Sequence, residues 1–437
     1  MTVGEHIDYD YAKGCLERTG ISGMKEKMKL TKLEKYWILY DVGNSAFTLL
    51  VATILPIYFN YLAGQGGLSE VDALAWWGYA ASASTLIVAF IGPVLGTVAD
   101  TDGYKKPIFT GAMMVGVIGC AALSVPTSWV VFLAVFVIAK VGYSASLVFY
   151  DAMLADVTTP ERMDQVSSQG YAWGYIGSCI PFIVSLLFVL GNETIGISMS
   201  TAMMIAFFIN AGWWLIVTIP LLRTYEQKHG VSPQKHVVRE SFGRLAKVVR
   251  DIRGHKKILL FLVSFFFYID GVYTIIEMAT AYGSALGLDS TGLLLALLVT
   301  QIVAFPFALI FGWAAKMYSN TSLIKLCIVS YFCIALFAIQ LDKQWEFWLL
   351  AVCVGMFQGG IQALSRSYFA SIVPAQKSGE FFGIYDICGK GASFMGTALV
   401  AFMSQLTQNP SSGVGMIAVL FVVGFVVFGK AVKAERS

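Results

Sequence analysis

The chain has 437 residues, of which 57% are hydrophobic and 13% charged, and its formal net charge is +3. A soluble domain carries roughly a quarter charged residues, so this composition leaves too little polar surface for a water-soluble fold of such length. The apolar residues run in stretches of about twenty or more, the length needed to cross a bilayer core of roughly 30 Å. The sequence therefore predicts an all-α polytopic membrane protein.

Twelve spans are predicted in chain order, joined by short connections with one exception. Their approximate ranges are 36–62, 74–99, 107–125, 129–156, 166–190, 199–222, 258–285, 290–315, 322–341, 346–373, 380–406 and 412–430. The exception is the connection 223–257, which holds ten Lys and Arg residues. The predicted division is an N-terminal segment 1–35, a first six-helix half 36–222, a central loop 223–257, a second six-helix half 258–430 and a tail 431–437.

Within the central loop, four apolar residues recur at helical spacing among basic ones: Phe242, Leu245, Val249 and Ile252. This pattern is typical of a basic amphipathic helix that lies on the inner leaflet, where anionic lipids attract its cations. A solvated linker helix is the alternative interpretation.

Lys and Arg are distributed unevenly between the two sides of the predicted bundle. A cytoplasmic N-terminus places 26 of the 30 Lys and Arg residues on the cytoplasmic side, where positive loops are retained. The outer loops then hold Glu70, Asp72, Glu193, Asp289 and Asp342. We expect both termini in the cytoplasm and the protein in the plasma membrane, or in the vacuolar membrane of a eukaryote. Residues 1–35 contain no apolar segment of a cleavable signal peptide, so the first span is expected to act as the targeting signal.

Several chemistries are disfavoured by absent motifs. The seven cysteines form no CxxC pair, so neither a disulfide framework nor a metal site is expected. The sequence lacks the GxxxxGK[ST] phosphate-binding loop, which disfavours ATP-driven transport as its mechanism. It also lacks HExxH and GxSxG, which counts against an intramembrane protease or lipase. We expect no enzyme activity, no cofactor and no nucleic-acid partner. The expected partners are a small-molecule substrate, protons and membrane lipids, and the expected state is a monomer.

The connection between spans 2 and 3 contains Gly96, Asp100, Gly103, Lys105 and Lys106. Gly96 permits close helix packing, Gly103 turns the chain, and Asp100 can accept hydrogen bonds from a neighbouring helix end. This spacing resembles the signature loop of major facilitator transporters. Weak repeats between the two halves, such as Gly96 and Gly312, agree with the duplicated architecture of that superfamily.

Three further stretches narrow the resemblance: Tyr40–Phe47, Gln358–Ser367 and Glu380–Lys390. Together they resemble the vacuolar amino-acid effluxer branch of the major facilitator superfamily, known from autophagy. The resemblance implies a major facilitator fold with two six-helix halves, and export of neutral amino acids is the role best known for that branch. Asn44 in the first stretch is a candidate substrate residue.

Eight charged side chains lie well inside predicted spans, away from the span ends, where each costs roughly 2.5–3.5 kcal/mol on insertion. They are Asp41 in span 1, Lys140 and Asp151 in span 4, Asp270 and Glu277 in span 7, Arg366 in span 10, and Asp386 and Lys390 in span 11. In the resembled fold, spans 1, 4, 7 and 10 line the central cavity and span 11 lies beside it. All eight are therefore candidates for substrate binding or coupling.

Each candidate also has a structural interpretation. Asp386 and Lys390 are four residues apart and either neutralise each other or contact substrate. Asp41 and Asp151 lie nearer the cytoplasmic side and suit a gate or a helix-end contact.

Asp270 and Glu277, seven residues apart on one helix face, are candidates for proton coupling or for a hydrogen-bonded structural pair. Arg366 suits either a substrate carboxylate or a salt bridge to Asp151 or Asp386. Its place near the cytoplasmic end of span 10 favours the salt bridge.

The sequence thus predicts a secondary transporter of a small zwitterionic, amino-acid-like solute that works by alternating access coupled to protons. An exporter of an amphiphilic or lipid-like compound is the alternative within transport. A membrane scaffold or receptor that transports nothing is the alternative from another class.

Overall fold

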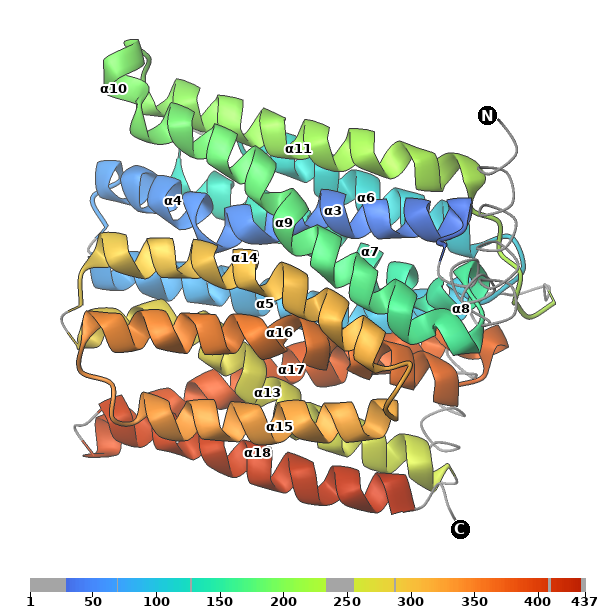
Figure 1. Cartoon of the computed structure of the whole chain (residues 1–437). Helices are drawn as coiled ribbons and strands as arrows, with labels where there is room; N and C mark the ends of the chain where they lie inside the picture. The colour runs from blue at the N-terminus through green and yellow to red at the C-terminus, as the bar shows by residue number, and fades with distance from the viewer. Residues whose placement is uncertain are drawn as a thin grey trace, which may run out of the picture.

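The structure, a computed structural model, describes residues 29–68, 70–125, 128–232, 255–286, 288–407 and 410–433. The predicted amphipathic helix at 242–253, most of segment 1–35 and the end of the tail lie outside the described residues, as does the side chain of Lys390. The long helices run side by side, and α3 begins at the same end of the bundle at which α18 ends (Figure 1).

The helices before the central segment are α3 (Lys32–Ala52), α4 (Ile54–Gln65), α5 (Glu70–Ala99), α6 (Lys105–Ala122), α7 (Trp129–Ala152), the short α8 (Leu154–Val157), α9 (Met163–Leu190), the short α10 (Asn192–Ile195) and α11 (Met199–Thr224). Those after it are α13 (Lys256–Ala285), α14 (Ser290–Ala314), α15 (Asn320–Ala338), α16 (Gln344–Ile372), α17 (Ser378–Thr407) and α18 (Pro410–Lys433). Each predicted span coincides with one long helix to within a few residues, except that α3 and α4 share the first.

Local sequence explains how this first span begins and where it breaks. Thr31 and Glu34 form a capping box, in which the Glu34 N–H donates to Thr31 Oγ1 at 3.2 Å and the Thr31 N–H donates to Glu34 Oε2 at 2.7 Å. The break between α3 and α4 falls at Thr53. Pro56 follows it and has no N–H to donate to the carbonyl of Ala52, which favours a break of the helix here.

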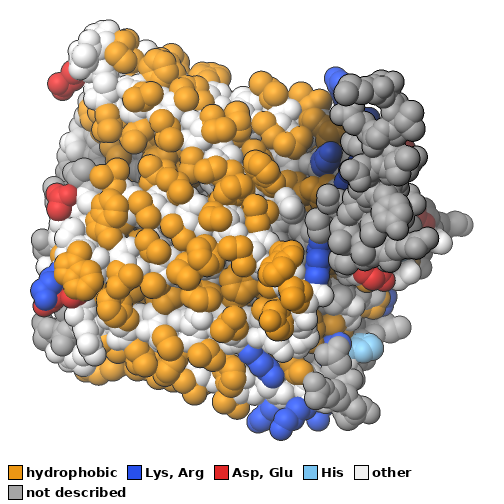
Figure 2. Space-filling model, viewed as in Figure 1, with side chains coloured by type: hydrophobic (Ala, Val, Ile, Leu, Met, Phe, Trp, Pro, Cys, Tyr) orange, Lys and Arg blue, Asp and Glu red, His pale blue; other side chains and the backbone are white. Residues whose placement is uncertain are grey.

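The surface of the bundle suits a lipid environment. Among the described residues, ten helical segments are long and apolar enough to cross a membrane. The remaining two long helices are α6, which opens with Lys105 and Lys106, and α17, which contains Glu380 and Asp386. Phe90 is 77% exposed, an arrangement that is unfavourable in water and favourable against acyl chains. On the face shown in Figure 2, hydrophobic side chains cover the middle while Lys and Arg gather at the right-hand end.

We call that end, where α3 begins and α18 ends, the basic end. Its described cations include Lys105, Lys106, Arg162, Lys256 and Lys257. The predicted charge asymmetry is therefore present as two chemically different ends of the bundle.

The helices pack as two groups. In the first group α3 packs on α9 and α11, and α6 packs on α7; in the second, α13 packs on α17 and α18, and α14 packs on α16. The groups meet chiefly where α5 packs on α17 and where α9 packs on α14 and α16. These junctions bring residues from opposite ends of the sequence together.

The two groups repeat each other's internal contacts. Tyr40 of α3 is hydrogen-bonded to Ser146 of α7 at 2.5 Å, and Tyr268 of α13 is hydrogen-bonded to Ser365 of α16 at 2.6 Å. This correspondence supports the duplication suggested by the sequence.

Candidate functional site

Arg366 of α16 lies at the centre of a buried charge cluster between the two groups of helices. Its guanidinium is 2% exposed. Nη1 lies 3.1 Å from Asp151 Oδ1, and Nη2 lies 3.3 Å from Asp41 Oδ2. Nε donates to Ser167 Oγ at 2.9 Å, and Nη2 donates to the carbonyl of Ser167 at 3.0 Å. One of the two salt-bridge partners considered for Arg366, Asp151, is therefore present, together with Asp41.

Three aromatic rings complete this cluster, and none of them was among the candidate site residues predicted from the sequence. The Arg366 guanidinium carbon lies 4.2 Å from the ring centre of Tyr171, 4.7 Å from that of Trp37 and 5.5 Å from that of Tyr150. These distances are within cation–π range. The available signal was spacing, since Trp37 precedes Asp41 by one helical turn and Tyr150 adjoins Asp151.

Glycine is needed where α9 passes the cluster. A Cβ on Gly170 would lie 3.1 Å from Arg366 Nη2 and 3.2 Å from the Trp37 ring. The face of α9 that carries Gly170 therefore packs directly against the charge cluster.

A second set of contacts at the basic end involves the loop between α5 and α6. Asp100 accepts hydrogen bonds from the N–H groups of Gly379 at 2.8 Å and Glu380 at 2.9 Å, at the start of α17. This is the helix-end contact predicted for Asp100. Gly103 has a φ of 82°, which glycine adopts without strain. Lys106 is half-buried.

Lys105 is fully buried and links this loop to a carboxylate that sequence analysis missed. Its Nζ lies 3.2 Å from Asp156 Oδ2 and 3.9 Å from Asp100 Oδ1, and it donates to Ser378 Oγ at 3.0 Å. Asp156 is the last residue of the predicted span 129–156, where a carboxylate looks like an ordinary boundary residue. The basic pair of the signature loop therefore contributes one buried ion-pairing residue and one at the surface.

Asp156 also holds the start of the central segment against the bundle. Asp156 accepts hydrogen bonds from the Tyr225 hydroxyl at 2.6 Å and from the His229 N–H at 2.9 Å. Burial and the neighbouring Asp156 carboxylate raise the pKa of Tyr225, so its hydroxyl stays a donor. Val231 pairs with the signature loop, since its N–H donates to the carbonyl of Asp100 at 2.7 Å.

The two carboxylates of α13 lie in different surroundings. Asp270 is fully buried; its Oδ1 accepts from the Gly396 N–H at 2.8 Å and from Thr274 Oγ1 at 3.3 Å. Its Oδ2 is buried and has no hydrogen-bond partner in the part of the chain that the structure describes. Glu277, two turns further on, is exposed.

The remaining candidates are Lys140, Asp386 and Asn44. Lys140 and Asp386 are half-buried. The Asp386 carboxyl is near enough to Tyr143 and Tyr273 to interact electrostatically with both hydroxyls. Asn44 donates to the carbonyl of Tyr40 at 3.0 Å, so it acts as an internal helix contact here.

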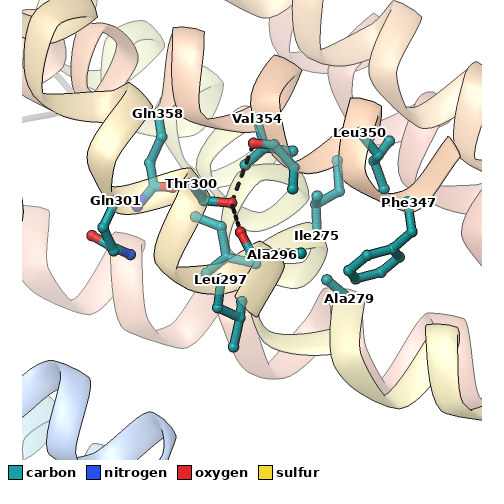
Figure 3. A pocket seen from close by; sticks show the side chains of 12 residues that line it. Ile275, Ala279, Ala296, Leu297, Thr300, Gln301, Phe347, Leu350, Val354 and Gln358 are labelled. Atoms are coloured by element: carbon teal, nitrogen blue, oxygen red, sulfur yellow. Dashed lines mark hydrogen bonds between the residues drawn. The ribbon is translucent and has the colours of Figure 1, made fainter. Parts of the chain in front are cut away.

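A cavity of about 40 Å³ lies between α13, α14 and α16 (Figure 3). Gln301 and Gln358 lie at one side of it and Phe347 and Leu350 at the other. Thr300 turns its hydroxyl to backbone carbonyls, at 3.0 Å from that of Ala296. This volume accommodates a water molecule but not an amino acid.

Among the described residues, no group of three or more His, Cys, Asp or Glu side chains is placed to hold a metal ion. The cysteines in this part of the chain are free thiols.

Comparisons with known proteins show the family of the chain. The family model described as vacuole effluxer Atg22 like matches residues 66–160 and 155–437. The MFS-type transporter YxiO of Bacillus subtilis is 43% identical over 404 residues, which cover 91% of this chain and 94% of that protein. Autophagy-related protein 22 of Yarrowia lipolytica is 26% identical over 297 residues, which cover 60% of this chain and 49% of that protein.

Solved structures confirm the predicted fold. The structure of the human organic anion transporter MFSD10 matches with a TM-score of 0.68 at 14% identity, covering 91% of this chain and 99% of that one. The fucose:proton symporter FucP of E. coli matches with a TM-score of 0.67 at 13% identity, covering 92% of this chain and 97% of that one. The chain is an integral, multi-pass membrane protein of the major facilitator superfamily, and it belongs to the Atg22-like family of transporters.

Proposed function

We propose that this transporter moves a small amino-acid-like zwitterion by alternating access, with coupling to protons and with its basic end in the cytoplasm. The observation that carries the proposal is the Arg366 cluster. The ion pairs of Arg366 with Asp41 and Asp151 join the two groups of helices near the basic end. When the groups separate there, these pairs must break.

Contacts between the groups at the basic end therefore suit a gate with two states. The ion pairs, the Asp100 cap on α17 and the hydrogen bonds from Ser367 and Asn320 to Asp164 all join helices of different groups. In alternating access, a site between two rigid halves opens to one side as such contacts break and to the other as they form.

The amino-acid-like character of the substrate is supported by charges of both signs within helices of the two groups. Lys140 belongs to α7, Glu277 to α13 and Asp386 to α17. A zwitterion needs both a cation and an anion as partners. The family description and the autophagy-related relatives are in keeping with this substrate class.

Coupling to protons is supported by Asp270. A carboxylate with one oxygen buried and unpartnered is unfavourable in an apolar core, and a proton on that oxygen removes the charge. The symporter FucP among the structural neighbours transports protons with its sugar.

The experiment is uptake into proteoliposomes. Purified protein is reconstituted with a pH gradient, and accumulation of radiolabelled neutral, acidic and basic amino acids is measured beside the alkalinisation that each causes. Accumulation that needs the gradient, with a matching pH change, is the expected result. If an amino acid equilibrates without needing the pH gradient, the proposal of proton coupling is wrong. If none of the amino acids is transported, the proposed substrate class is wrong.

Orientation is tested separately with single cysteines. Replacements at Glu193 and Asp342 should react with an impermeant maleimide added outside cells, and those at Lys106 and Lys377 should react only after the membrane is opened. The opposite pattern at two or more positions would reverse the proposed orientation.

A further inference from the structure

The side chain of Arg366 is bound entirely by the other group of helices. Arg366 belongs to α16, whereas its hydrogen-bond, ion-pair and ring partners among the described residues all belong to α3, α7 and α9. We call these partners the guanidinium cage: Trp37, Asp41, Tyr150, Asp151, Ser167 and Tyr171. The guanidinium thus lies in its cage as a ligand lies in a receptor.

Withdrawal of Arg366 would leave the cage with an uncompensated charge. Asp41 and Asp151 would keep two carboxylates in a mostly buried position without their cation. Leaving a buried charge unpaired is strongly destabilising. When the two groups of helices separate at the basic end, water, a proton or another positive species must therefore replace the guanidinium beside these carboxylates.

The cage is built to keep its shape without Arg366. Trp37 stacks on Tyr150 with ring centres 4.3 Å apart, and its Nε1 donates to the carbonyl of Tyr150 at 3.0 Å. Tyr40 packs against Tyr150 from another side, with ring centres 4.6 Å apart. Trp37, Tyr40 and Tyr150 are fully buried and belong to α3 and α7, so their contacts do not depend on α16.

We propose that the cage is a binding site for the guanidinium group of a solute, occupied from the basic end once Arg366 has withdrawn. The proposal rests on the alternating access proposed above. The geometry selects a planar, forked cation, since carboxylates accept from two nitrogens, the Ser167 carbonyl accepts from one of them, and Tyr171 and Trp37 lie over the guanidinium. An alkylammonium carries the positive charge, but it has neither the forked pair of N–H donors nor the planar shape of a guanidinium.

Arg366 and such a solute would compete for the same cage. The tethered Arg366 favours the conformation that is closed at the basic end, and a solute guanidinium favours the one that is open there. The class of solute that this site recognises is a monoalkylguanidinium compound.

The first test empties the cage. Thermal unfolding of purified Arg366→Ala is measured with ethylguanidinium, with ethylammonium and with ethylurea, a neutral compound of similar shape, at equal ionic strength. Saturating ethylguanidinium should raise the melting temperature by about 2 °C or more, ethylammonium by less and ethylurea not at all. The rise should vanish in the triple variant Arg366→Ala, Asp41→Asn, Asp151→Asn. Equal rises with all three compounds, or no rise with ethylguanidinium, would overturn the proposal.

The second test uses the intact cage and does not depend on the folding of that variant. Ser168 is fully buried, and its Cβ lies 2.7 Å from the position of a Cβ built on Gly312 of α14, across the junction of the two groups. In Ser168→Cys, ethylguanidinium at constant pH should raise the maleimide labelling rate by about threefold or more, since it favours the open state. If the labelling rate responds to lower pH and not to ethylguanidinium, then the cage carboxylates bind protons when Arg366 withdraws, and the proposal is overturned.

The outcome of these two tests does not depend on whether the proposed function is correct. Both read binding or opening without measuring transport, so absence of amino-acid uptake would leave a positive result intact. Conversely, amino-acid uptake without any response to ethylguanidinium would support the proposed transport function and contradict the proposal that the cage binds a solute guanidinium.

Discussion

Gly96 of α5 and Gly379 of α17 face each other backbone to backbone, and a Cβ on Gly379 would lie 2.6 Å from the carbonyl oxygen of Gly96. A Cβ on Gly96 would lie 2.8 Å from the carbonyl carbon of Gly379. Neither backbone can yield as a flexible side chain would. The close approach of the two groups of helices at this point requires glycine on both sides.

Gly96→Ala should therefore weaken the junction between α5 and α17 and favour the state open at the basic end. The expected results are a lower melting temperature and faster labelling of Ser168→Cys. The matched control is Gly212→Ala in α11, since a Cβ there meets nothing within 4 Å and alanine favours helix by about 1 kcal/mol. Equal stability of the two variants would contradict the assigned role of Gly96.

Removing the cap on α17 should have a related effect. Asp100→Ala leaves the buried N–H groups of Gly379 and Glu380 without their acceptor, at about 1–3 kcal/mol each. Because this contact exists only while α5 and α17 are together, we expect labelling of Ser168→Cys to accelerate. Asp102→Ala, an exposed position two residues on, is the control. An unchanged rate in Asp100→Ala would mean that the cap does not hold the junction.

Asp156→Asn should release the start of the central segment. The amide carries no charge to offset the buried Lys105, and removal of one partner of a buried pair costs about 3–5 kcal/mol. We expect faster tryptic cleavage after the exposed Lys228 and a lower melting temperature. Glu226→Gln, exposed on the same segment, should leave both unchanged.

The pH dependence of this contact has a definite sign. The pKa of Tyr225 is raised in the folded protein, so its contribution to stability is full below the ordinary tyrosine pKa of about 10 and declines as the pH rises above it. Tyr225→Phe should therefore flatten the loss of stability above that pH. An identical alkaline profile in wild type and variant would contradict this assignment.

Proton coupling is tested on the two carboxylates of α13. Asp270→Asn keeps an acceptor for the Gly396 N–H while removing the charge, so it mimics a permanently protonated acid. It should abolish pH-driven accumulation but spare exchange at equal pH, which does not require the empty carrier to return. Glu277→Gln is measured beside it, with the exposed Asp342→Asn as control. Unchanged accumulation in both test variants would move coupling to Asp41, Asp151 or Asp386, or remove it.

The sequence predicted the fold more completely than the site, and the reason is physical. Span length and charge asymmetry are local properties, so each predicted span coincides with a long helix. The cap by Asp100 was also predictable, because its chemistry belongs to one short loop.

Partners of Arg366 could be predicted only in part, since they lie on helices up to 325 residues away in the sequence. Periodicity tells which residues share a helix face, but not which helix that face meets. Asp151 was anticipated from its depth and charge. Trp37 and Tyr171 look like any aromatic residue in an apolar span until the guanidinium is placed between them.

The last prediction separates the gate role of Arg366 from a substrate-clamp role. Arg366→Lys keeps the positive charge but loses the planar fork that contacts Asp41, Asp151 and Ser167 together. A gate role predicts a lower melting temperature, since part of the ion-pair network is lost, while substrate affinity stays close to that of wild type.

Arg366→Ala should be more damaging, because it leaves two carboxylates without a cation at a cost of about 3–5 kcal/mol or more. Neutralising both in the variant Arg366→Ala, Asp41→Asn, Asp151→Asn should restore much of the lost stability, because the unpaired charges are gone. Melting temperatures and substrate affinities of the single, double and triple variants form a mutant cycle that isolates the pairing energy. If Arg366→Lys instead weakens substrate affinity about tenfold with an unchanged melting temperature, and the triple variant recovers nothing, then the guanidinium binds substrate and the gate must depend on the Asp100 cap and the α5–α17 junction alone.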